Sequence, residues 1–186
     1  MARRFTIATA LAVLFTCMLW GSASPASAAK KKRGCARVAV VPTAATLAEA
    51  HTAVLCLINQ ERARRRLAKL RSSAELAQAA TGHSSDMVAQ KYFAHESLDG
   101  ATPKQRVLRS GYFRGSAGGM VEEALACGWA QLSTPRALVN SLMRSASHQV
   151  ILLSRSLRDV GIGLALGGPE PGFSGGATLT LDFARR

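Results

Sequence analysis

Residues 160–184 read VGIGLALGGPEPGFSGGATLTLDFA, and this stretch contains two strand patterns joined by glycine and proline. The first pattern covers residues 160–166 and the second covers residues 177–184. In the second, apolar and polar side chains alternate: Leu179, Leu181 and Phe183 with Thr178, Thr180 and Asp182. Alternation with a period of two is typical of a strand that has one buried face. The glycines and prolines of residues 167–176 indicate a connecting loop. The chain is therefore predicted to end in a pair of strands.

Most of the chain before this pair has helical patterns. The predicted segments are a helix beginning at Thr46, a helix over 73–90, a short helix from Thr102 that ends before Gly111, a strand over 121–129, a helix over 134–145 and a short turn at 147–153. In the first helix, Ala50, Val54 and Leu57 have the spacing of one apolar face. Helices followed by a closing strand pair are typical of an α+β domain, with helices covering an antiparallel sheet.

The N-terminus has the features of an export signal. Arg3 and Arg4 precede an uncharged apolar run over residues 5–20, and Ala26-Ser27-Ala28 forms a small-residue cleavage site. The alternative is an uncleaved anchor, but the run is shorter than the roughly 20 residues that a membrane span needs. We therefore expect a secreted protein that begins near Ala29.

Three segments are predicted: a signal peptide over 1–28, a basic irregular leader over 29–46 and one domain over 47–186. The chain has a formal charge of +13, and part of that charge lies in the leader at Lys30, Lys31, Lys32, Arg33 and Arg37. The leader is either a solvated tail or a segment attracted to an anionic surface or acidic polymer. Nucleic acid is not an expected partner of an exported chain.

Three cysteines remain after the signal, which contains Cys17, is removed: Cys35, Cys56 and Cys127. An odd number in an oxidising compartment allows one disulfide, and three pairings are open. We favour Cys35 with Cys56, because the leader needs an attachment and Cys56 lies on the first predicted helix. Cys127 would then be a free, buried thiol. The cysteine and histidine spacing is not that of a zinc finger.

Six short blocks resemble the CAP superfamily, the cysteine-rich secretory, antigen 5 and pathogenesis-related proteins. The blocks are LINQER (57–62), AATGHSSDM (79–87), YFAHESLDG (92–100), EALACG (123–128), SASHQVIL (145–152) and RDVGIG (158–163). They occur in the order of the family and cover about 130 residues. The resemblance implies an α-β-α sandwich with a large surface cleft, into which two histidines and two acids project in many members.

Carried over to this chain, the cleft residues are His95, His148 and Glu123, and Ser145 stands where the second acid is usual. Some family members bind a divalent metal there, so zinc could bind weakly to His95 and His148 with help from Glu123. Glu122, next to Glu123 on the same strand, should face the opposite side and be exposed to solvent. We interpret His83 as a structural histidine on the inner face of its helix.

The sequence departs from the family pattern in three more places: Ala124 replaces an asparagine, Leu142 an aromatic residue and Gln149 a basic residue. No nucleophile with a matched base is evident, so we favour a binding module over an enzyme. The expected ligand is an extracellular lipid, peptide or cell-wall fragment. The alternative is an extracellular hydrolase or protease that uses the same cleft.

Overall fold

The computed structural model describes residues 34–170 and 175–186. The predicted signal peptide and the lysines of the basic leader lie outside the described residues. The helices are η1 (Ala44–Thr46), α1 (Leu47–Arg64), α2 (Ala74–Gln90), α3 (Pro103–Arg109), η2 (Ala130–Ser133), α4 (Pro135–Arg144) and α5 (Ala146–Leu152). The strands are β1 (Arg71–Ser72), β2 (Met120–Trp129), β3 (Asp159–Leu166) and β4 (Gly176–Arg185). Among these helices, none combines the length and the apolarity that a bilayer span requires.

Local sequence signals explain where three helices begin. The Ser73 hydroxyl accepts a hydrogen bond from the backbone of Leu76 at the start of α2. Thr102 and Gln105 form a reciprocal capping box at the start of α3. Thr134 caps α4, in which Pro135 occupies the first turn. The predicted helices are therefore confirmed to within about two residues, and the predicted turn at 147–153 is the short helix α5.

The strands form one sheet in the order β1-β3-β4-β2. The pairs β2–β4 and β3–β4 are antiparallel, as predicted. The pair β1–β3 is parallel, which makes the sheet mixed rather than purely antiparallel. The strand β1 was not predicted, because a strand of two residues has no periodicity.

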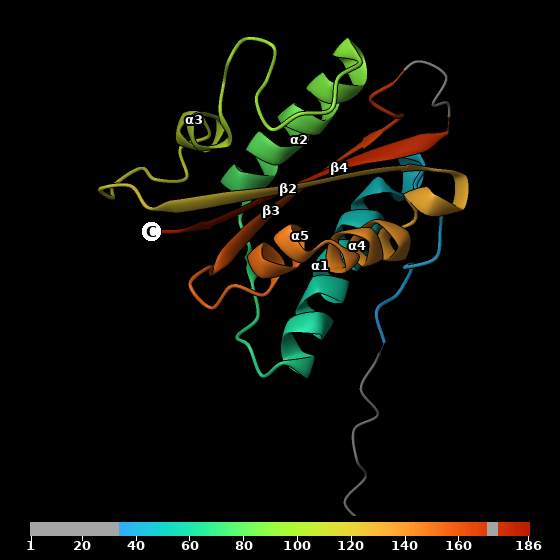
Figure 1. Cartoon of the computed structure of the whole chain (residues 1–186), viewed down its shortest axis with the longest axis horizontal. Helices are drawn as coiled ribbons and strands as arrows, with labels where there is room; N and C mark the ends of the chain where they lie inside the picture. Colours follow the sequence, from blue (N-terminus) through green and yellow to red (C-terminus); the bar gives the residue numbers. More distant parts are fainter. Residues whose placement is uncertain (1–33, 171–174) are drawn as a thin grey trace, which may run out of the picture. The chain divides into compact units, whose positions relative to one another are not determined.

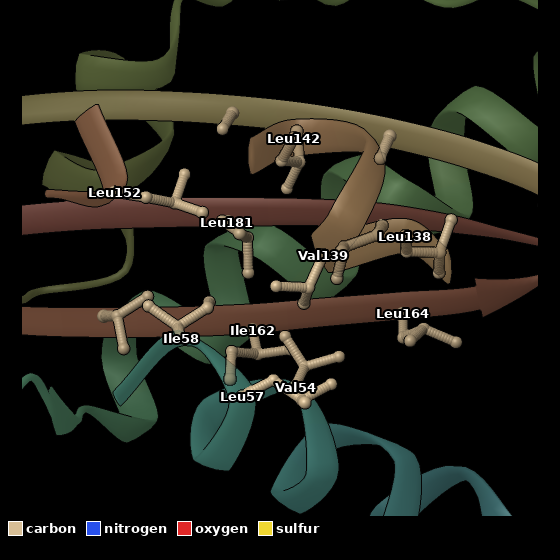
Figure 2. Packing of buried hydrophobic residues seen from close by; sticks show 14 of the residues in the cluster. Val54, Leu57, Ile58, Leu138, Val139, Leu142, Leu152, Ile162, Leu164 and Leu181 are labelled. Atoms are coloured by element: carbon tan, nitrogen blue, oxygen red, sulfur yellow. The ribbon is translucent and has the colours of Figure 1, made fainter. Parts of the chain in front are cut away.

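Helices cover both faces of the sheet, which confirms the predicted α-β-α arrangement of the domain. Figure 1 shows α2 and α3 on one side of the strands, and α1, α4 and α5 on the other. The larger core lies on the second side, where side chains of α1, α4 and α5 meet β3 and β4 (Figure 2). The alternation in β4 explains this asymmetry, since Leu179, Leu181 and Phe183 enter the larger core while the intervening residues face α2.

Two glycines of β3 allow α2 to lie against the sheet. A Cβ atom on Gly161 would be 2.0 Å from the backbone carbon of Leu76, and one on Gly163 would be 2.0 Å from that of Ala80. Neither residue has a positive φ, so the reason for glycine is close packing and not backbone conformation. The G-x-G of the last family block is therefore the surface on which α2 rests.

The first family block connects α1 to two loops. The side chain of Arg62 is buried and donates hydrogen bonds to the carbonyl oxygens of Ala68, Leu152 and Ser154 at 2.8, 2.8 and 3.0 Å. Asn59 exchanges two hydrogen bonds with the backbone of Leu70. Both residues therefore have structural roles.

The leader is attached as predicted. A disulfide joins Cys35 to Cys56 on α1, with 5.7 Å between the Cα atoms. Cys127 is free, also as predicted, but it is partly exposed rather than buried. Burial of part of the side chain raises the pKa of the Cys127 thiol.

Candidate functional site

Glu123 is the centre of the candidate site. It lies on β2 directly opposite Asp182 of β4, on the sheet face that α2 covers, and 1% of its side chain is exposed. Its Oε1 is 2.7 Å from Nδ1 of His95, and its Oε2 is 2.6 Å from a guanidinium nitrogen of Arg106. A buried carboxylate requires such partners. The predicted pairing of Glu123 with a histidine is present, and Glu122 is exposed as expected.

Arg106 is one of two residues of this site that were not predicted from the sequence. It lies on α3, 9% of its side chain is exposed, and it also donates hydrogen bonds to the Ser97 hydroxyl and the Ala101 carbonyl oxygen. An arginine in a helix of seven residues has no periodic signal of burial. Its partner becomes visible only when α3 is placed beside β2.

Asp182 is the second acid next to Glu123. It is fully buried, and a hydrogen bond between its carboxyl group and that of Glu123 requires a proton on one of the two. Burial raises the pKa of Asp182 well above the usual range, and the charge of Glu123 adds to this effect while that of Arg106 opposes it. Asp182 therefore resists ionisation beside the Glu123 carboxylate. We call Glu123, Asp182, Arg106 and His95 the Glu123 cluster.

This raised pKa makes the free energy of unfolding depend on pH. The unfolded chain releases the Asp182 proton near 3.8 and the folded chain only at higher pH, so this contribution to stability is lost as the pH rises through the folded-state pKa. Asp182→Asn cannot titrate. We expect the stability of the variant relative to the wild type to increase with pH above 3.8.

Urea denaturation at a series of pH values measures this difference. Asp86→Asn is the control, because a hydrogen bond from Tyr92 lowers the pKa of Asp86. Titration of Asp86 therefore changes the free energy of unfolding only in acid solution. A stability difference for Asp182→Asn that stays constant across the range would contradict a raised pKa.

His95 presents one ring nitrogen to solvent. Since a carboxylate only accepts hydrogen bonds, the contact with Glu123 assigns the proton to Nδ1 and leaves Nε2 as an acceptor in the neutral ring. The side chain of His95 is 56% exposed. His95 therefore combines a fixed orientation with access from solution.

His83 positions the loop that carries His95. It is buried on α2, and its Nε2 lies 2.9 Å from the carbonyl oxygen of Ala94. Burial lowers the pKa of His83, so the ring is neutral and donates to that carbonyl. The structural interpretation of His83 is confirmed. Because Ala94 precedes His95 in the loop, His83 affects the site indirectly.

His148 lies near His95, and Ser145 does not join the cluster. Burial lowers the pKa of His148, and the charge of His95 lowers it further. The interaction means that the two predicted histidines lie close to each other, although His148 is on α5 and His95 is in the loop after α2. The hydroxyl of Ser145 lies 3.0 Å from that of Ser147.

A cavity of about 290 Å³ lies beside the Glu123 cluster. Its lining includes His83, Ser97 and Arg106, from α2, the following loop and α3. His95, Glu123 and His148 do not line it, so the hollow next to the cluster differs from the cleft that the resemblance implied.

The donor set does not fit a resident zinc ion. Among the described residues, no group of three or more histidine, cysteine, aspartate or glutamate side chains is arranged to hold a metal. Both oxygens of Glu123 already have partners in His95 and Arg106. Catalytic zinc sites use three protein ligands, whereas His95 and His148 supply two.

Comparisons with known proteins agree with this architecture. No curated relative matches the chain significantly. Among solved structures, an extracellular protein containing an SCP domain from Bacillus anthracis str. Ames is 25% identical, with a TM-score of 0.58 over 72% of this chain. The present chain covers 39% of the length of that protein. An outer surface protein from Borrelia burgdorferi is 20% identical with a TM-score of 0.59, over 72% of this chain and 90% of its own, and this likeness shows the fold.

A family model agrees with the motifs and with the fold. The model of the cysteine-rich secretory protein family, CAP, matches residues 55–176. This range includes the six family blocks from α1 to β3 and the Glu123–His95 pair. The chain therefore belongs to the cysteine-rich secretory protein (CAP) family.

Proposed function

We propose that this protein is exported and binds an extracellular ligand through the surface formed by His95, Glu123 and His148. The observation that carries the proposal is the fixed orientation of His95, which Glu123 holds at Nδ1 while most of the ring faces solvent. A pre-oriented polar group at a surface lowers the entropy cost of binding. The signal-like N-terminus and the extracellular SCP-domain protein of Bacillus anthracis support export.

Binding fits the site better than hydrolysis. Glu123 is engaged by His95 and Arg106 and 1% of its side chain is exposed, so water has little access to its carboxylate as a general base. The Ser145 hydroxyl lies against Ser147 and is not paired with a histidine base. The contacts of Glu123 with His95 and Arg106 instead hold these two side chains in fixed orientations, which favours recognition of a ligand.

The segments that carry these residues also expose apolar side chains. Phe93 precedes His95 in the same loop, Met120 begins β2, and Val150 follows His148 on α5; all three are exposed. Apolar groups together with a fixed histidine suit an amphipathic ligand, such as a lipid or a peptide that has apolar side chains.

The test compares what purifies with the protein from its own secreting host. We expect mass spectrometry to find a lipid or peptide bound to the wild type. A His95→Gln, His148→Gln double variant should bind it about 30-fold more weakly, since two hydrogen bonds of about 1 kcal/mol each are lost. The control is a Gln131→Ala, Asn140→Ala double variant, which changes exposed polar residues elsewhere.

Retention of the same ligand in the same amount by the histidine double variant would contradict the proposal. Steady turnover of a peptide or ester substrate that depends on His95 would also contradict it, in favour of the hydrolase alternative.

A further inference from the structure

A second concave surface is lined by arginines. A cavity of about 450 Å³ lies where β1, the start of α2 and the end of β4 meet. Its charged lining residues are Arg71, Arg158, Arg185, Arg186, Glu75 and Asp159. No residue of the Glu123 cluster contributes to it. The four guanidinium groups outnumber the two side-chain carboxylates, so the side chains that line the cavity carry a net positive charge.

The two acids are already held by other groups. Asp159 accepts hydrogen bonds from Arg71 at 2.8 and 3.3 Å, and from the Tyr112 hydroxyl at 2.7 Å. Glu75 accepts a hydrogen bond from the Ser73 hydroxyl at 2.6 Å, which, together with its own backbone N–H, lowers its pKa. Asp159 therefore fixes Arg71 at the rim and neutralises only one of the four cations.

The other arginines are held mainly by uncharged groups, and the charge of Arg186 also acts on Glu75. Arg158 donates hydrogen bonds to the carbonyl oxygens of Arg155 and Leu157, and the guanidinium of Arg186 lies 4.6 Å from the centre of the Tyr112 ring. These contacts orient the guanidinium groups without cancelling their charge. Arg185 is exposed at the end of β4.

We propose that this cavity binds the phosphate groups of an extracellular ligand. The planar guanidinium fork matches phosphate oxygens in a bidentate geometry, and several such forks around one hollow select for phosphate over a single carboxylate. The N-terminal end of α2, at Ser73 and Ala74, adds the positive end of a helix dipole. The volume accommodates more than one phosphate, as in a short polyphosphate or a lipid headgroup.

The experiment measures binding of sodium tripolyphosphate to the purified protein by calorimetry at about 0.15 M salt, where long-range attraction is screened. We expect an Arg158→Gln, Arg185→Gln double variant to lose at least about tenfold in affinity, because it removes two guanidinium groups that are not paired with Asp159. The matched control, Arg136→Gln with Arg144→Gln, removes the same charge from exposed positions on α4 and should lose less than about twofold.

A second arm identifies the source of the phosphate. Vesicles of phosphatidylcholine with phosphatidic acid are compared with phosphatidylcholine alone. Binding to the vesicles that contain phosphatidic acid, lost in the Arg158, Arg185 variant, assigns a lipid headgroup. A response to tripolyphosphate alone assigns a soluble phosphate. Equal losses in the two double variants, or no binding of either probe by the wild type, would overturn the proposal. Thermal melting confirms that each variant is folded.

Discussion

Gly163→Ala is expected to lower the free energy of unfolding by about 3 kcal/mol, at the upper end of the usual cost of overpacking. The added Cβ would lie 2.0 Å from the backbone carbon of Ala80 and 2.2 Å from its oxygen. Backbone atoms cannot rotate away as a side chain does, so α2 must move off β3. Ser84 would be displaced with it, and its hydrogen bonds to the Gly163 carbonyl and the Thr180 hydroxyl would be strained.

Gly82→Ala is the matched control for this substitution. Gly82 lies in the interior of α2, is exposed, and has no atom within 4 Å of an added Cβ. Alanine there should stabilise the protein by about 0.5–1 kcal/mol through helix propensity alone. Urea denaturation of both variants measures the two effects, which have opposite signs. A loss of less than about 1 kcal/mol for Gly163→Ala would contradict the close packing of α2 on β3.

Glu123→Ala is expected to cost about 3 kcal/mol of unfolding free energy, at the lower end of the range for removing one partner of a buried ion pair. The change leaves the nearly buried guanidinium of Arg106 without its carboxylate and His95 without its orienting acceptor. The loss stays at the lower end because Asp182 can then ionise beside Arg106 and restore part of the missing charge.

Glu122→Ala is the neighbouring control, since Glu122 is exposed on the other face of β2. Its unfolding free energy should change by less than about 0.5 kcal/mol, as is usual at exposed positions. Chemical denaturation of the two alanine variants separates them. A larger loss for Glu122→Ala than for Glu123→Ala would mean that the register of β2 is shifted by one residue, and the Glu123 cluster would not exist.

Half of the Glu123 cluster was accessible from sequence. His95 and Glu123 stand at motif positions of the family, and a carboxylate in an otherwise apolar strand requires a partner. Arg106 and Asp182 were not identified. Asp182 occupies a polar position in the alternation of β4, where it resembles Thr178 and Thr180, and only the pairing of β4 with β2 places it opposite Glu123.

Local patterns were sufficient for the helices, the three long strands and the α+β class, because periodicity and capping residues act within a few positions of one another. The Cys35–Cys56 bond was the favoured one of three possible pairings, and the structure contains it. The parallel strand β1 and the partners of Arg106 and Asp182 depended on tertiary structure. Residues 106, 123 and 182 meet because α3, β2 and β4 pack together, and the raised pKa of Asp182 follows from that shared burial. The arginine cavity has the same origin, since Arg71, Arg158 and Arg185 come together only when the sheet aligns β1 with β3 and β3 with β4.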